Sequence, residues 1–90
     1  MSERHDIEQM LAAGDTLGAL AALDRLIAAR GADDSLYCLR GKAHYRAGRW
    51  QQAMEDYMEA LRLNPASPAA GALEMTREIL EFYNKDIYGQ

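Results

Sequence analysis

The feature that most constrains the fold is a pair of amphipathic segments that occurs twice, 34 residues apart. The later copy, residues 36–65, reads LYCLRGKAHYRAGRWQQAMEDYMEALRLNP, and its two halves meet at the turn Ala47-Gly48-Arg49. Apolar residues recur at helical spacing through the second half. Asn64-Pro65 ends that half, because a residue that precedes proline is disfavoured in the helical conformation. The stretch therefore predicts two helices joined as a hairpin.

The earlier copy carries the same turn and the same apolar positions. Subtraction of 34 places Gly48 on Gly14 and Tyr57 on Leu23, and the turn Ala13-Gly14-Asp15 repeats the later one. A glycine inside a helix, such as Gly41, usually allows a close approach of backbones. A fixed period of about 34 residues built of paired helices is typical of a repeat array. We therefore expect two antiparallel helix hairpins, at about residues 2–31 and 34–65.

This pattern resembles the tetratricopeptide repeat family, most closely over residues 34–67. The signature positions of that family are occupied here by Tyr37, Gly41, Ala53, Tyr57, Ala60 and Pro65. The copy over residues 2–33 is weaker and has Ile7 where the later copy has Gly41, and no further repeat can be fitted beyond residue 67. The resemblance implies an all-α fold in which two hairpins stack as an α-α superhelix.

A fifth helix is predicted at about residues 67–87, where it caps the array and completes a single domain over residues 1–90. Ser67 and Pro68 suit its start. One apolar stripe is expected to pack on the second hairpin and consists of Leu73, Thr76, Leu80, Tyr83 and Ile87. A second stripe consists of Ala72, Met75, Ile79 and Phe82. Either the helix is deeply seated, which is the favoured interpretation, or the second stripe offers a surface to a partner or to a second copy.

Two residues of the better copy depart from the family pattern, namely Arg40 and His44, which lie one helical turn apart. The favoured interpretation is structural, with the Arg40 stem over apolar surface and its head group in water. One repeat earlier the equivalent of Arg40 is Asp6, so the pattern allows an ion pair between stacked helices. Glu55, Asp56 and Glu59 are interpreted as a solvated helix face.

Composition excludes several classes of protein. The net charge is -4, with acidic and basic residues interspersed, which argues against general attraction to nucleic acid or to a membrane surface. The single cysteine, Cys38, excludes an internal disulfide and agrees with a reducing compartment. The first residues are polar, and no apolar run approaches the roughly 18 residues that span a membrane. A cytoplasmic protein is the resulting expectation.

Catalytic chemistry has no support in the sequence. His5 and His44 are far apart, and neither has a second ligand at a metal-site spacing. Cys38 lacks a recognisable nucleophile context, and no glycine-rich phosphate loop is present. We therefore expect no catalytic, cofactor-binding or metal-binding residues.

What the resemblance implies is binding, because the first helix of each tetratricopeptide hairpin lines a concave groove for extended peptides or partner helices. On the matching positions the groove candidates are Glu8, Leu11, Ser35, Cys38, Leu39, Lys42, Tyr45 and Arg46, with Ala69, Ala72, Leu73 and Thr76 on the last helix. Spacing alone places Lys42 and Arg46 one turn apart, where they can hold a carboxylate, a phosphate or an acidic peptide. Their interpretation as ordinary solvated charges is slightly favoured.

Two function classes follow from these observations. The first is an adaptor that binds a short peptide or helix of another protein, although the chain lacks the Lys, Asn and Arg set with which one subclass holds the C-terminal carboxylate of chaperone tails. The second is a structural domain that forms a homodimer through the stripe of Ala72, Met75, Ile79 and Phe82. Fewer than three repeats is marginal for a solitary array, which supports the second class. Measurement of the mass in solution distinguishes the two.

Overall fold

The computed structural model describes residues 3–31 and 33–88, with side chains described as far as Tyr83. These residues form five helices and no strand: α1 (Glu3–Ala12), α2 (Thr16–Arg30), α3 (Asp34–Arg46), α4 (Trp50–Leu63) and α5 (Ala69–Tyr88). The predicted all-α fold is thereby confirmed. The predicted start at Ser2 and the side chain of Ile87 lie outside the described residues.

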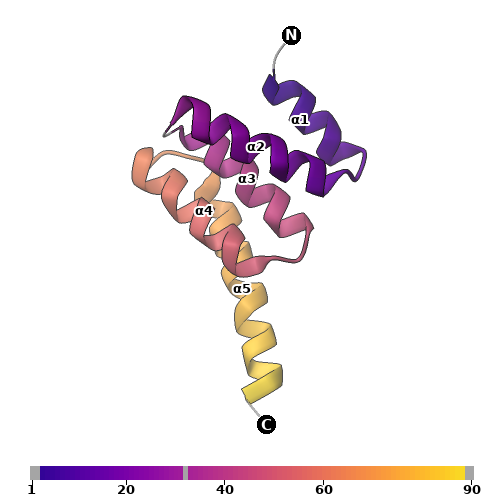
Figure 1. The fold of residues 1–90 in the computed structure, drawn as a ribbon. Helices are drawn as coiled ribbons and strands as arrows, with labels where there is room; N and C mark the ends of the chain where they lie inside the picture. Colours follow the sequence, from indigo (N-terminus) through magenta and orange to yellow (C-terminus); the bar gives the residue numbers. More distant parts are fainter. Residues whose placement is uncertain (1–2, 32, 89–90) are drawn as a thin grey trace.

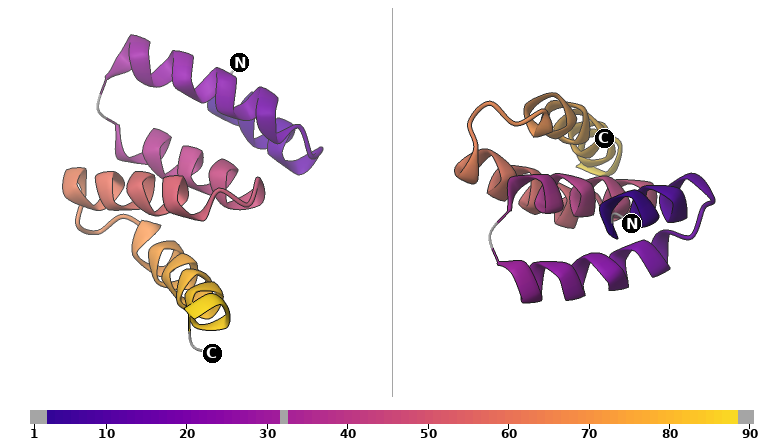
Figure 2. Two further views of the ribbon diagram at one scale, coloured as in Figure 1. Left: turned by 60° about the horizontal axis from the view of Figure 1, so that its bottom comes forward. Right: turned by 90° about the horizontal axis from the view of Figure 1, so that it is seen from above.

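Helices α1 and α2 form hairpin 1, and α3 and α4 form hairpin 2 (Figure 1). Hairpin 2 packs on hairpin 1 through α3 and α2, and α5 packs on α4 (Figure 2). Both hairpin turns use a glycine with positive φ, 85° at Gly14 and 76° at Gly48. Residues with a Cβ rarely adopt this conformation, which explains why the same residue type recurs at the repeat period.

Buried apolar side chains hold the helices together in two groups. The larger group lies among α1, α2 and α3 and includes Ile7, Leu23 and Leu36. The second group joins α4 to the first turns of α5 and includes Tyr57 and Leu73. Each hairpin therefore buries one face of its helices against the next layer, as the repeat pattern predicts.

The contact between α3 and α4 depends on Gly41. A Cβ built on this glycine would lie 2.6 Å from Cε1 of Tyr57, so the aromatic ring occupies the space that a side chain would need. The close backbone approach predicted from the sequence is confirmed.

An ion-pair network joins α2, α3 and α4, and it corrects two predictions. Arg40 donates from Nε and Nη2 to the two carboxylate oxygens of Asp56, both at 2.8 Å, and from Nη1 to Asp24 at 3.0 Å. The Arg40 head group is therefore held by these two aspartates, and not by water or by Asp6 as predicted. Asp56 is 5% exposed rather than part of a solvated face, because α4 turns it toward α3. Burial lowers the pKa of the neighbouring His44, whose Nε2 lies 3.6 Å from the same carboxylate.

Helix α5 is only half covered, so the favoured prediction of a deeply seated cap is wrong. Its first turns are buried through Leu73 and Thr76, and Ser67 accepts a hydrogen bond from the Ala69 amide at 3.1 Å, as expected of the predicted cap. The second half extends away from the two hairpins (Figure 1). There Phe82 is 68% and Tyr83 46% exposed. The molecule measures 50 × 29 × 19 Å in consequence.

Candidate functional site

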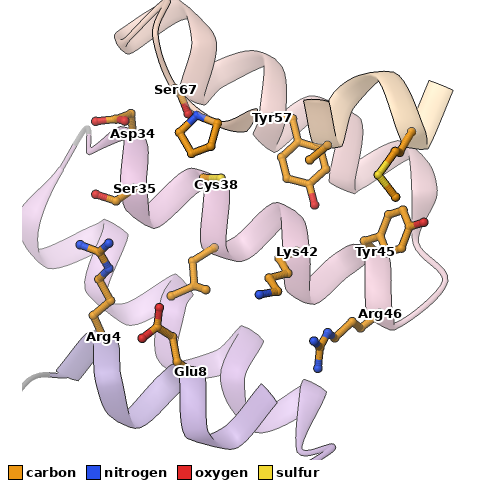
Figure 3. A pocket seen from close by; sticks show the side chains of 14 residues that line it. Arg4, Glu8, Asp34, Ser35, Cys38, Lys42, Tyr45, Arg46, Tyr57 and Ser67 are labelled. Carbon is orange, nitrogen blue, oxygen red and sulfur yellow. The ribbon is translucent and has the colours of Figure 1, made fainter. Parts of the chain in front are cut away.

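The main concavity is a groove that runs between α1, α3 and α5, with a volume of about 650 Å³ (Figure 3). Helix α3 forms its floor and α1 one wall, while α4, the turn after it and α5 form the other wall. The lining residues are Arg4, Glu8, Asp34, Ser35, Cys38, Leu39, Lys42, Tyr45, Arg46, Tyr57, Ser67, Pro68, Ala72 and Met75. Most of this surface is apolar, and the charged side chains stand on α1 and α3.

Helical spacing along α3 explains which of its residues form the floor of the groove. Ser35, Cys38, Lys42 and Arg46 lie three or four residues apart and therefore share one face. The adjacent face of the same helix carries Gly41, which is held against α4. One amphipathic helix thus supplies both the packing that fixes its position and the surface that faces the groove.

The structure brings together eight of the twelve predicted groove residues, namely Glu8, Ser35, Cys38, Leu39, Lys42, Tyr45, Arg46 and Ala72. The other four do not line the groove. Leu11 is 3%, Leu73 9% and Thr76 0% exposed, because each lies on the inner face of its helix and packs against a neighbouring helix. Ala69, expected at the far wall, is likewise buried, whereas Ala72 does line the groove.

Six lining residues were not predicted from the sequence: Arg4, Asp34, Tyr57, Ser67, Pro68 and Met75. Tyr57 belongs to α4, and its ring passes beside Gly41 to reach the groove (Figure 3). Ser67 and Pro68 belong to the turn that places α5 beside α3. These residues come from different elements, and the spacing within one helix does not predict which residues of another element lie beside it.

The basic groups of the groove are held differently. Arg46 donates from Nη1 to the backbone oxygen of Leu11 in α1 at 2.9 Å, and that oxygen also accepts from the Gly14 amide at 3.1 Å. Arg46 is thus fixed in place rather than freely solvated. Lys42 is exposed, and no hydrogen bond or ion pair engages its ammonium group within residues 3–31 and 33–83. Helix α3 therefore presents one anchored and one available cation to the groove, one turn apart.

Two weakly acidic groups in the groove stay protonated near neutral pH. Burial raises the pKa of the half-buried Cys38 thiol, which disfavours the thiolate and hence a nucleophilic role. Burial also raises the pKa of Tyr57 to about 12, so its phenol remains a hydrogen-bond donor. These two side chains can therefore make apolar contacts and donate hydrogen bonds to a ligand in the groove.

The second stripe of α5 is largely open. Met75 is 56% and Phe82 68% exposed, while Ile79 is half-buried and Ala72 faces the groove. A separate hollow of about 490 Å³ lies beside this stripe and is lined by Tyr45, Trp50, Met75, Glu78, Ile79, Phe82 and Tyr83. Self-association through the stripe stays a prediction.

In the part of the chain that the structure describes, no three His, Cys, Asp or Glu side chains are grouped so that they could hold a metal ion. None of the described helices combines the length and apolar character that crossing a bilayer requires.

Comparison with known proteins agrees with this architecture. The tetratricopeptide repeat profile matches residues 35–67, which cover α3, α4 and the turn to α5. The fold is similar to that of a Bacteroides fragilis protein determined by solution NMR, with 40% sequence identity and a TM-score of 0.86. That similarity covers 100% of this chain and 92% of the other. No curated protein matches the chain. With its five stacked helices and the match over hairpin 2, the chain belongs to the tetratricopeptide repeat family.

Proposed function

We propose that the chain is a non-catalytic protein-interaction module whose groove holds a short peptide of another protein. Tetratricopeptide repeats generally bind other proteins, which supports the general class. The observation that carries the specific proposal is a largely apolar groove with the available cation Lys42 on its floor. Ligand sites are usually concave and mostly apolar, with a few polar groups that fix orientation.

The lining residues indicate which peptide chemistry fits. Tyr45 and Met75 offer apolar contact to a side chain of the peptide. Lys42 and the free N–H groups of Arg46 can bind an acidic side chain, since a guanidinium has five donors and only one is used by α1. A volume of about 650 Å³ suits a segment of a few residues. We expect a ligand with one apolar anchor and one carboxylate.

A peptide-display selection on the intact chain tests this proposal. Selected peptides are synthesised, and their dissociation constants are measured by fluorescence anisotropy against the parent and the Lys42→Glu variant. We expect acidic and apolar residues to be enriched, and Lys42→Glu to weaken binding by about tenfold or more, since it removes an attraction and adds a repulsion.

The matched control is Arg25→Glu, which makes the same charge change at an exposed residue of α2 outside the groove. It should leave the affinity within about twofold, because exposed charges at a distance are screened. Equal binding by the parent and Lys42→Glu would reject the groove as the site. If no peptide is selected and the parent sediments as a dimer, the self-assembling alternative replaces the adaptor.

A further inference from the structure

Residues 69–80 of α5 occupy the position of the first helix of a third hairpin, but the helix does not turn after them. The residues that correspond to the turns at 13–14 and 47–48 are 81–82, and α5 runs through them without a break. Met75 corresponds to Gly41 and Ile7, which both hairpins bury. Here that position is 56% exposed. The face that hairpins 1 and 2 cover with their own second helix is therefore open on α5.

This open face has the composition of a contact surface. Met75, Ile79 and Phe82 lie at positions i, i+4 and i+7 of α5 and so share one face. Beside them Tyr45 and Trp50 stack edge to face, with ring centroids 5.1 Å apart. Aromatic residues and methionine are enriched where proteins meet. Together these residues form what we call the α5 face.

Charge distinguishes the α5 face from the groove. Glu78 lies between Met75 and Phe82 in helical spacing and lines the same hollow. Glu74 and Glu81 continue an acidic edge one turn to either side. Within residues 3–31 and 33–83, no ion pair engages these three carboxylates.

From this arrangement we propose that the α5 face docks a basic amphipathic helix of another protein. The apolar side of that helix packs on Phe82, Met75 and Trp50, and its Lys or Arg residues meet the acidic edge. A helix is the fitting shape, because the open face is the one that a second helix covers in both hairpins. The site adjoins the groove and shares Tyr45 and Met75 with it. Its acidic edge favours a basic ligand, whereas Lys42 on the floor of the groove favours an acidic one, so the two sites select ligands of opposite charge.

A second copy of this chain fits the face less well. Two copies that met through Phe82 and Met75 about a two-fold axis would use the same patch on both sides. The glutamates within and beside that patch would then stand near their own equivalents. Like charges that are brought close together repel each other, whereas the Lys or Arg residues of a basic partner attract the same carboxylates.

The test uses a synthetic amphipathic helix with leucines on one face and lysines along its borders. Its binding to the full chain is measured by fluorescence anisotropy, beside a peptide of equal composition with scattered leucines. We expect saturable binding of the first peptide only. Phe82→Ala should weaken it by about tenfold, as truncation of an anchoring aromatic does. Leu17→Ala is the matched control, since Leu17 is an equally exposed apolar residue (66%) on α2.

A second set of variants reverses charges in the same binding assay. Glu78→Lys should weaken binding of the basic peptide by several fold and should allow binding of a version that carries glutamates in place of lysines. Glu55→Lys, at an exposed acid of α4 outside the hollow, controls for net charge. Circular dichroism confirms that each variant stays helical.

Three outcomes overturn the proposal. The first is the absence of saturable binding, or equal binding of the scrambled peptide. The second is loss of binding in Lys42→Glu but not in Phe82→Ala, which would place the helix in the groove. The third is a parent chain that sediments as a dimer and a Phe82→Ala variant that sediments as a monomer, which would assign the face to a second copy. The groove proposal is unaffected by the first and third outcomes, since its own test uses different ligands and variants.

Discussion

Hairpins 1 and 2 share a backbone plan but are held together by different chemistry. At equivalent positions, hairpin 1 has Ile7 opposite Leu23, and hairpin 2 has Gly41 opposite Tyr57. Hairpin 1 pairs two medium-sized aliphatic residues, whereas hairpin 2 pairs the smallest residue with a large aromatic. In hairpin 2 the Tyr57 ring occupies the space that a side chain at residue 41 would need. The same backbone plan is therefore packed by different pairs of side chains in the two hairpins.

The same comparison holds for the polar residues. Hairpin 2 carries Arg40, His44 and Asp56, and the equivalent positions of hairpin 1 are Asp6, Met10 and Ala22. The buried ion pair is thus an addition to hairpin 2. Hairpin 1 uses apolar contact at two of those positions, since Met10 and Ala22 pack on the core. Hairpin 2 should therefore be the more sensitive to loss of a single polar group.

The largest effect is expected for Asp56→Ala, which copies the residue of hairpin 1 into hairpin 2. It leaves Arg40 half-buried with Asp24 as its remaining partner, and removal of one member of a buried pair is strongly destabilising. We expect a loss of about 3 kcal/mol in the free energy of unfolding, measured by urea denaturation followed by circular dichroism.

Two variants serve as controls for this experiment. Asp24→Ala removes the exposed partner of Arg40 and should cost less than about 1 kcal/mol. The double change Arg40→Met/Asp56→Ala removes both charges and should recover most of the loss. If Asp56→Ala costs no more than Asp24→Ala, the buried pair does not hold hairpin 2 together.

Gly41→Ala should have the next largest effect. Its new Cβ would lie 2.6 Å from the Tyr57 ring, so the ring or α4 must move, at a cost of about 2 kcal/mol. The comparison with hairpin 1 sharpens this prediction, because Tyr57→Leu restores the equivalent residue and makes room. A double-mutant cycle should show that the second change is less costly, or even favourable, when the first is present. If the costs of Gly41→Ala and Tyr57→Leu simply add, the contact between the two residues does not explain why glycine is paired with tyrosine in hairpin 2.

These particular residues show how far the sequence predicts the structure. The helices, their turns and the α3 floor of the groove follow from local spacing, and they were predicted. Asp56 was missed, although it stands with Ala53, Tyr57 and Ala60 at inward spacing, and an inward Arg40 requires a buried counter-charge. That signal was present in the sequence.

The extent to which α5 is covered had no such signal. The stripe predicted to pack on the second hairpin does so in the first turns of α5, but no local pattern shows where the helix leaves the two hairpins. The covered stripe draws Leu73 and Thr76 into the core and leaves Met75 and Phe82 outside. The division between the groove and the α5 face therefore comes from tertiary packing, which also buries the predicted groove residues Ala69, Leu73 and Thr76 of α5.

The smallest expected effect is a gain, and it concerns the starts of α2 and α4. The backbone is nearly the same at both, with φ −83° and ψ 66° at Asp15 and φ −94° and ψ 71° at Arg49. Asp15 accepts a hydrogen bond from the Gly18 amide at 3.0 Å, whereas no side chain caps α4. Arg49→Asp should therefore stabilise the protein by about 0.5 kcal/mol, since a cap and a negative charge both suit a helix start.

The neighbouring residue sets the size of this gain. A Cβ at Gly18 would lie 2.3 Å from Asp15 Oδ2, and the equivalent residue of hairpin 2 is Gln52, which has a Cβ. The new carboxylate must then take another rotamer, which is why we expect less than the usual value of a cap. Adding Gln52→Gly frees that space but places a glycine within α4, which costs about 1 kcal/mol. Thermal unfolding should accordingly rank Arg49→Asp above the parent and the double variant below Arg49→Asp. A double variant more stable than the single one would mean that hairpin 1 keeps Gly18 for the sake of its cap.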